Sequence, residues 1–543
     1  MGRKGRPSLK QRITHKGNES PQYRIPVKKT WLSDCLDSHN RCRTEDLTLI
    51  GFVPTRLLDV GPSDGSLAPR LRLTKDCSDD TQTYITLSHC WGNPDNQMKQ
   101  RMSTTKASLG LRMKHIDLKS LPRVFQDAII VTRFLDVRWL WIDSLCILQD
   151  SNYDWKVESA MMAQIYACGL CNIAANVDVR PSQGFLSLST RPLGVPNDSM
   201  LSYGHTWIQQ AEGGKLGTRA WCLQERYLSP RIIHVGDGNS WLWECNTCLI
   251  SAGELDNLRF DRHTNEIQRW ERKSPKKFSV SLWPKDFSYA RIFDFDKNIG
   301  QDEMRRLAFE QWHRIVEDYS KRDLTLEKDK FPALSGLAHK VQRITGGTYI
   351  AGLWKEDILR GLLWRSFDLC RCERVSEYRA PSWSWASING PVELMPALTD
   401  QIVGDSELET KDKMLSMANV LGVEATLAGK DPMGQMKIGS YLMVTGILRK
   451  ALSHPVTTPL LLQPEQGTSM SNPPKKLYFD IPDNSNLRDF WYLPLVANVD
   501  QSECYGLLLQ SAQTGTFYRI GVFEGQRDDF PTKDFPEETI TII

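Results

Sequence analysis

Three short apolar segments alternate with two helical segments between residues 84 and 177, and this succession constrains the fold most. The apolar segments are 84–88, 137–143 and 170–177, and the helical segments are 120–137 and 152–167. Within the first helical segment, Val124, Ala128 and Val131 recur at helical spacing. The order strand, helix, strand, helix, strand is typical of a parallel α/β sheet flanked by helices.

Polar residues follow two of these strands where each strand ends. Asp143 closes the second apolar segment, and a turn that includes Ser88, His89, Trp91 and Gly92 closes the first. Because ligands of open α/β sheets bind beyond the carboxyl ends of the strands, both groups are expected to face one crevice. Ser88 and His89 are neighbours on a strand and should point to opposite faces, so they do not predict a nucleophile and its base.

A second acidic candidate lies on the helix that follows Asp143. Trp155, Glu158, Met162 and Ile165 share one helical face, and three of the four are large and apolar. A carboxylate on a buried face is unfavourable unless it is paired. Glu158 is therefore either a catalytic carboxylate or the partner of a structural ion pair.

The third candidate cluster lies in residues 217–235. Arg219, Gln224 and Glu225 stand among large apolar residues there. These polar groups either line the same crevice or belong to a helix packed on the sheet. In the second case Arg219 forms a bidentate bridge with a carboxylate, Glu158 being the expected partner.

The length of 543 residues predicts several domains. We expect a basic tail at 1–30, an extension at 31–80, an α/β core at 81–240, a helical region at 241–395 and a β-rich region at 396–543. Within the helical region, residues 380–387 predict a strand in which Trp383 and Trp385 alternate.

Charge is unevenly distributed along the chain. Residues 1–30 hold nine of the 68 Lys and Arg but one of the 65 acidic residues, which leaves the remainder slightly acidic. The tail is either a solvated segment or an element for nuclear import or for binding an anionic surface. A slightly acidic body makes a nucleic-acid partner an unfavoured interpretation.

The sequence predicts neither a membrane span nor a signal peptide, because no apolar stretch is long enough for either. Thirteen cysteines, most of them in apolar surroundings, indicate reduced thiols and a cytoplasmic protein. Two Cys-x-x-Cys pairs offer a weak alternative, a zinc site made by Cys168, Cys171, Cys245 and Cys248. No other cluster of metal ligands is predicted.

Three motifs, in this order, resemble the fungal heterokaryon-incompatibility (HET) domain family. They are "LSHCWG" at 87–92, with His89 in place of the usual aromatic residue, "LWIDSLCILQD" at 140–150, and "TRAWCLQE" at 218–225. Residues 80–395 contain further sequence typical of HET proteins. Three ordered motifs with unusual Trp, Asp and Cys content are far more specific than one short motif.

The resemblance implies a fungal protein that recognises non-self after cell fusion and triggers programmed cell death. HET domains are thought to be remotely similar to Toll/interleukin-1-receptor (TIR) domains, so a TIR-like α/β core is expected. Some TIR domains cleave NAD with a catalytic Glu, which is an analogy at the level of the fold.

Two functions remain open from the sequence. In the first, Glu158 and Asp143 hydrolyse NAD or a related nucleotide, with Ser88, His89, Trp91 and Gly92 shaping the pocket. NAD is then a substrate, and no cofactor is expected, because no phosphate-binding loop or dinucleotide fingerprint is present. In the second, the protein is a non-catalytic signalling module that self-associates or recruits an incompatibility partner. A pocket lined by Asp143, Glu158 and Trp91 favours the first, and closed ion pairs favour the second.

Overall fold

The computed structural model divides the chain into two compact units, Met1–Ile292 and Phe293–Ile543, each with its own sheets. The structure describes residues 25, 29–43, 51–77, 83–92, 95–176, 184–186, 214–236, 241–252, 258–261, 266–269, 276–278, 299–395, 414–429, 431–451, 476–482, 490–498, 503–527, 530 and 536–543. The basic tail predicted at 1–30 lies almost entirely outside these residues.

The first unit is built on one sheet of eleven strands in the order β11-β10-β9-β8-β7-β6-β5-β3-β4-β1-β2. The strands are β1 (Arg56–Asp59), β2 (Arg70–Leu73), β3 (Tyr84–Ser88), β4 (Trp139–Ile142), β5 (Cys171–Ala175), β6 (Arg231–Val235), β7 (Trp241–Cys245), β8 (Cys248–Ala252), β9 (Leu258–Asp261), β10 (Glu266–Arg269) and β11 (Lys276–Phe278). The sheet continues past residue 240, where the sequence suggested a change of region.

The centre of this sheet is parallel. Strand β3 pairs in parallel with β4 and β5, and β5 pairs in parallel with β6. Strands β1 and β7 border this centre in antiparallel orientation. The predicted mixed α/β class with a parallel sheet is therefore confirmed.

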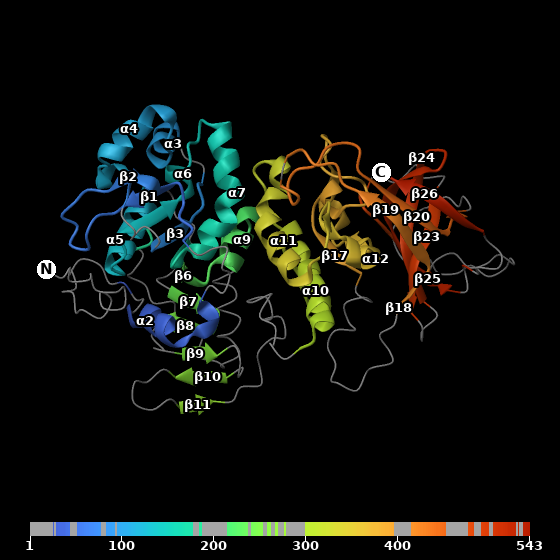
Figure 1. Cartoon of the computed structure of the whole chain (residues 1–543), viewed down its shortest axis with the longest axis horizontal. Helices are drawn as coiled ribbons and strands as arrows, with labels where there is room; N and C mark the ends of the chain where they lie inside the picture. The colour runs from blue at the N-terminus through green and yellow to red at the C-terminus, as the bar shows by residue number, and fades with distance from the viewer. Residues whose placement is uncertain are drawn as a thin grey trace. The chain divides into compact units, whose positions relative to one another are not determined.

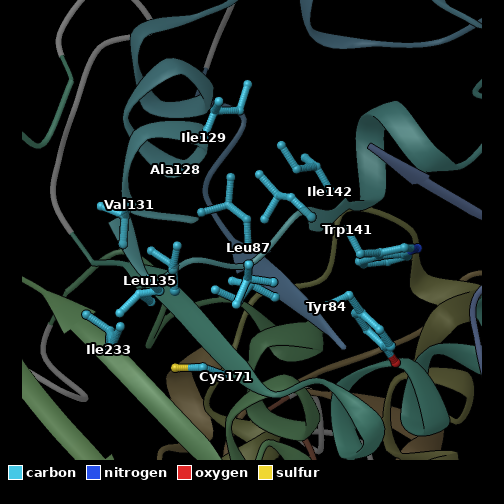
Figure 2. Packing of buried hydrophobic residues seen from close by; sticks show 14 of the residues in the cluster. Tyr84, Leu87, Ala128, Ile129, Val131, Leu135, Trp141, Ile142, Cys171 and Ile233 are labelled. Atoms are coloured by element: carbon cyan, nitrogen blue, oxygen red, sulfur yellow. The ribbon is translucent and has the colours of Figure 1, made fainter. Parts of the chain in front are cut away.

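Two helices cover opposite faces of the parallel centre. Helix α5 (Arg123–Phe134) brings Ala128 and Val131 against Leu87 of β3, as Figure 2 shows. Helix α7 (Asn152–Cys168) lies on the other face, where the Tyr84 hydroxyl donates to the Ile165 carbonyl at 2.7 Å. Successive side chains of a strand point to opposite faces of the sheet. Tyr84 and Leu87 are three positions apart on β3, so one side chain faces α7 and the other faces α5.

The remaining helices of the first unit are short. Among the described residues they are α2 (Lys29–Ser38), α3 (Asn96–Met102), α4 (Lys106–Lys114), α6 (Asp143–Cys146) and α9 (Ala220–Leu228), with the 3-10 turns η1 (Asn40–Cys42), η3 (Thr74–Asp76) and η5 (Leu118–Ser120). Helix α2 lies beside β7 and β8 (Figure 1), and Trp31 and Leu32 on it belong to the main hydrophobic core.

The second unit contains two long helices, α10 (Gln301–Ser320) and α11 (Pro332–Thr345), and a nine-stranded sheet. Seven strands run in the order β18-β23-β24-β25-β26-β20-β19, while β21 pairs with β23 and β22 with β25. These strands are β18 (Met414–Ser416), β19 (Ala418–Glu424), β20 (Tyr441–Ile447), β21 (Arg449–Lys450), β22 (Lys476–Phe479), β23 (Trp491–Asn498), β24 (Glu503–Gln513), β25 (Thr516–Gln526) and β26 (Glu537–Ile542). Helices and a β-rich C-terminal sheet are therefore present, but the helices begin at α10, because the start of the predicted helical region, residues 241–278, contains the strands β7–β11.

Residues 380–387 differ from the predicted strand. They form a turn followed by a 3-10 helix, η11 (Trp385–Ser387), although Trp383 and Trp385 are both buried. The Ser384 hydroxyl accepts a hydrogen bond from the Ala386 amide and donates one to the Ala351 carbonyl at 2.6 Å. These hydrogen bonds pair backbone groups within a turn instead of with a neighbouring strand. The prediction of a strand was wrong because two alternating buried Trp residues do not by themselves require a strand.

Among the described residues, no helix combines the length and the apolar content that a membrane span requires.

Candidate functional site

A polar cluster lies at the carboxyl ends of the parallel strands. Ser88 is the last residue of β3, and its hydroxyl donates a hydrogen bond to the Glu225 carboxylate on α9. The Asn172 side chain on β5 donates to the Ser88 hydroxyl at 3.0 Å and accepts from the Thr86 hydroxyl at 3.0 Å. The cluster therefore joins two neighbouring strands to the helix that carries the third sequence motif.

Glu225 is the buried acid of this cluster. Burial raises the pKa of its carboxyl above the ordinary value, while the Ser88 hydrogen bond and the Arg219 charge oppose that rise. The Tyr166 side chain on α7 interacts with the same carboxyl. Because the charged form is disfavoured, Glu225 holds its proton to a higher pH than a free glutamate does.

His89 points to the opposite face of the strand from Ser88. Its ring meets the Phe125 ring of α5 edge-on at 4.9 Å, and its Nδ1 lies 3.8 Å from Asp143 Oδ1. Full burial lowers the pKa of His89 to about 4, against the attraction of Asp143, so the ring is neutral at pH 7. Its Nε2 has no hydrogen-bond partner among the described residues.

Asp143 directly follows β4 as the first residue of α6, and its side chain is 29% exposed. Its Oδ1 accepts a hydrogen bond from the Ser144 amide at 2.6 Å. The carboxylate therefore binds the adjacent backbone amide in the turn after the strand. Its partial exposure also leaves it accessible to a ligand.

Arg219 and the turn after β3 complete the surroundings of the cluster. The Arg219 Nη1 donates to the His89 carbonyl at 2.5 Å, which ties the start of α9 to this turn. Trp91 is half-buried and stacks near His89, with ring centroids 6.4 Å apart. Gly92 is exposed and has a φ of 63°, a conformation that favours glycine.

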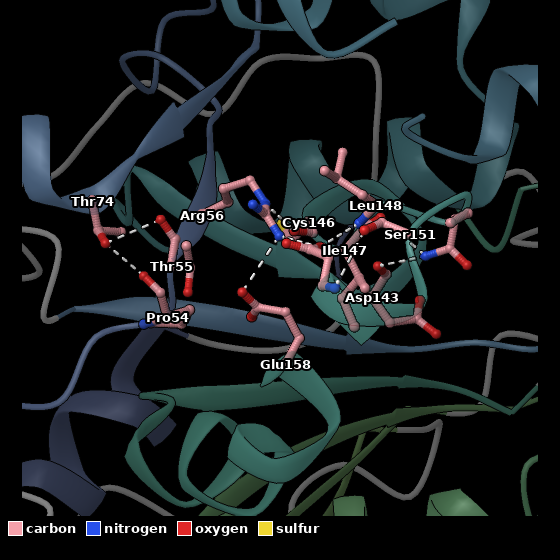
Figure 3. A network of polar contacts seen from close by, with 12 residues as sticks. Pro54, Thr55, Arg56, Thr74, Asp143, Cys146, Ile147, Leu148, Ser151 and Glu158 are labelled. Atoms are coloured by element: carbon pink, nitrogen blue, oxygen red, sulfur yellow. Dashed lines mark hydrogen bonds and ion pairs between the residues drawn. The ribbon is translucent and has the colours of Figure 1, made fainter. Parts of the chain in front are cut away.

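Glu158 is buried, as the stripe on its helix predicts, but its ion pair is with Arg56 of β1 rather than Arg219. The distance from Arg56 Nη2 to Glu158 Oε1 is 3.4 Å, and Figure 3 shows the two side chains facing each other. The same Arg56 nitrogen lies 2.5 Å from Asp154 Oδ2. Burial raises the pKa of the Glu158 carboxyl above its ordinary value.

Two further sequence candidates occupy other surroundings. Gln224 is buried, and its Oε1 finds no partner among the described residues. Cys168 and Cys171 do not belong to the group of metal-ligating side chains that the structure brings together. That group contains Cys245 with Cys35, His39 and Cys42, whose ligand atoms all lie within 4.8 Å of one another.

Several residues of these networks were missed from the sequence. Asn172 is a polar residue inside the otherwise apolar strand "CNIAA", and this pattern indicates a buried side chain that needs a hydrogen-bond partner. The spacing Cys35-x₃-His39-x₂-Cys42 was equally visible. No sequence signal connects Arg56 to Glu158, because their pairing depends on the position of β1 beside β4.

The sheet, its flanking helices and this cluster form a mixed α/β domain with a polar site at the strand ends. Residues 84–225 match the family model described as "Heterokaryon incompatibility protein (HET)". The chain therefore contains a HET domain over these residues, as its three motifs predict. No curated protein and no solved structure matches the chain significantly.

Proposed function

We propose that this chain is a fungal heterokaryon-incompatibility protein that acts in non-self recognition and programmed cell death. The HET domain at 84–225 supports this proposal. We further propose that the cluster at the strand ends is its working site, and that it hydrolyses NAD or a related nucleotide. The single observation that carries this second step is the buried Glu225, held by Ser88 where three parallel strands end.

The proposed chemistry is cleavage of the bond between ribose C1′ and the nicotinamide nitrogen. Nicotinamide leaves with the bonding electron pair, water adds to C1′, and the proton of that water passes to a carboxylate. Glu225 takes the role that the sequence suggested for Glu158, which is to stabilise the positive charge that develops on the ribose. Asp143, the more exposed carboxylate, accepts the proton of the water.

Two features of the surroundings support a ligand at this place. The first is position, because ligands of open α/β sheets bind beyond the carboxyl ends of parallel strands. The second is Asp143, whose side chain is 29% exposed at the end of β4 and whose charge acts on Glu225. A partly exposed carboxylate beside a buried one offers a ligand both an accessible and a desolvated acid.

The second candidate function is non-catalytic death signalling through self-association or recruitment of an incompatibility partner. Glu158 is closed in an ion pair with Arg56, which is the arrangement that this alternative predicts. Helix α7 also exposes two apolar side chains one turn apart, Tyr153 at 80% and Val157 at 40%. Exposed apolar residues on one helix face are suited to contact with another protein.

The test is inducible expression in a fungal host, with viability and intracellular NAD followed together. The variants are Glu225→Gln and Asp143→Asn, with Glu158→Gln as the matched control, since it neutralises a buried carboxylate of the same domain. We expect wild type and Glu158→Gln to deplete NAD before viability falls, and the other two variants to do neither. Immunoblots of the soluble fraction confirm that all four proteins accumulate.

Cell death with intact NAD would overturn the enzymatic proposal and favour the signalling module. In that case Val157→Asp on the exposed face of α7 is expected to reduce killing, with an accompanying loss of self-association or partner capture. If wild type does not kill and leaves NAD unchanged, the proposed role in cell death is also wrong.

A further inference from the structure

Four ligand-type side chains from two distant parts of the chain converge in the first unit. Cys35 lies on α2, and Cys245 is the last residue of β7. His39 directly precedes the turn η1, and Cys42 is its last residue. Their ligand atoms lie within 4.8 Å of one another, and all four residues are buried. Cys245 Sγ is 3.4 Å from His39 Nδ1.

These separations suit one tetrahedral ion. With Zn–S bonds of about 2.3 Å and a Zn–N bond of about 2.0 Å, neighbouring donor atoms lie roughly 3.5–3.8 Å apart. The 3.4 Å separation of Cys245 Sγ and His39 Nδ1 is close to this range, and the other separations, none above 4.8 Å, need a contraction of about 1 Å or less to close the cage. Three thiolates and one imidazole in tetrahedral arrangement form a typical structural zinc set.

A nearby charge gives an independent indication. Arg231 is 5% exposed, and its Nε donates to Cys35 Sγ at 3.2 Å. Its other hydrogen bonds go to the carbonyls of Cys42 and Leu170, and within the described part of the chain it has no carboxylate partner. A zinc ion with three thiolates and a neutral histidine carries a net charge of −1, which a buried guanidinium neutralises.

The hairpin between β7 and β8 supports the same conclusion. The Cys248 amide donates to Cys245 Sγ at 3.4 Å, a hydrogen bond that favours the thiolate form needed for metal binding. Cys248 Sγ itself is 3.7 Å from Cys245 Sγ, which places a further thiol beside the cluster but outside its four ligands. The Asn246 side chain donates to the Arg41 carbonyl at 2.6 Å and holds the hairpin against η1.

We propose that Cys35, His39, Cys42 and Cys245 bind a structural zinc ion that fastens α2 and η1 to the β7–β8 hairpin. Zinc binding releases the three thiol protons and leaves each sulfur as a thiolate ligand. All four coordination positions are filled by protein, so the ion has no position for substrate and acts on stability. This site is independent of the function proposed for the strand ends.

The first experiment measures zinc in the full chain, purified under a thiol reductant from zinc-supplemented cells. Mass spectrometry of the metal content is expected to give one equivalent of zinc per chain in wild type. Cys42→Ser and His39→Ala are expected to lose most of it. Cys171→Ala, which removes a buried cysteine of the same sheet outside the cluster, is expected to retain it.

The second experiment remains decisive if a variant does not fold. Wild-type protein is stripped with a strong chelator, and limited proteolysis and thermal unfolding are followed before and after metal is returned. We expect cleavage near residues 29–43 and a lower melting temperature after stripping, both reversed by Zn²⁺ and not by Mg²⁺. Reconstitution with Co²⁺ is expected to produce thiolate-to-cobalt charge-transfer absorption.

Three results would overturn the proposal. One is a metal-free wild-type protein with all thiols reactive under denaturing conditions. Another is a disulfide within the cluster, detected by mass spectrometry of alkylated protein prepared without reductant. The third is an unchanged zinc content in both Cys42→Ser and His39→Ala.

Discussion

Ser88 donates a hydrogen bond to Glu225, a residue 137 positions further along the chain. The two residues lie in the first and last of the three HET motifs, so one buried contact joins both ends of the matched region. The contact also explains why a serine ends an otherwise apolar strand. Its hydroxyl satisfies an acid that burial would otherwise leave unpaired.

Loss of this hydrogen bond is expected to destabilise the first unit. Ser88→Ala leaves a buried carboxyl without one of its donors, and we expect a decrease of about 1–3 kcal/mol in the free energy of unfolding. The measurement is urea denaturation of wild type and variant at pH 7. Adding Glu225→Gln should recover part of the loss, because the amide is neutral. Equal stability of Ser88→Ala and wild type would show that the contact is dispensable.

His89 is expected to make stability depend on pH. Its pKa is about 4 in the folded chain, because burial disfavours the charged ring, and about 6.5 when unfolded. Between these values the unfolded state binds more protons, so stability falls as the pH decreases from about 6.5 to 4. The loss reaches about 3 kcal/mol at most.

The control for this pH dependence is His89→Phe, which restores an aromatic residue like that of the family motif. Asp143 and Arg219 are the charged groups that act on this ring, and both remain in the variant. From pH 7.5 to pH 4, the free energy of unfolding measured from denaturation curves is expected to fall by up to about 3 kcal/mol more in wild type than in His89→Phe. Parallel curves for both proteins would show that other groups cause the dependence.

The ion pair beneath the sheet offers a third prediction. Arg56→Met removes the cation that faces Glu158 and Asp154, and breaking a buried pair in this way typically costs about 3–5 kcal/mol. Thermal or chemical unfolding measures the effect. Combining it with Glu158→Gln should reduce the loss, since the uncompensated charge is removed.

A surface pair is the comparison for Arg56. Lys476 pairs with Glu524 at 3.2 Å, and the lysine side chain is 55% exposed. Lys476→Met is expected to change stability by less than about 1 kcal/mol. Similar effects of the two substitutions would mean that burial does not strengthen the Arg56 pair.

The matched region is not expected to fold by itself. A fragment of residues 84–225 lacks β1, which pairs with β4, and it lacks β6 and the strands beyond it. The bare strand edges left behind favour aggregation. We expect the fragment to be insoluble and residues 29–292 to be soluble and monodisperse by size-exclusion chromatography. A soluble, cooperatively unfolding fragment of 84–225 would contradict this expectation.

The centre of the fold could be predicted because each segment carries its own local signal. The apolar run before Asp143 and the helical spacing from Val124 to Val131 identify a strand and a helix without tertiary information. Their alternation then implies parallel pairing. The flanking strands β1 and β9–β11 were not predicted, because they are short and are stabilised as strands by pairing with the neighbouring strands of the sheet.

The candidate site was predicted in part for a related reason. Strand ends identify Ser88 and Asp143, because the position follows from topology. Topology does not predict which residues pair with the buried carboxylates. Glu158 pairs with Arg56, whereas the sequence suggested Arg219. Long-range pairing is decided by which strands border the parallel centre, and three ordered motifs contain no information about that border.

The N-terminal helix α2 reaches its partners late during synthesis. His39 contacts Cys245, which is 206 positions further along the chain. At about 5–20 residues per second, the ribosome needs about 10–40 s to make the intervening segment. During that interval the apolar side chains of Trp31 and Leu32 lack the part of the core that β7 and β8 supply, so this helix is expected to dock among the last elements of its unit.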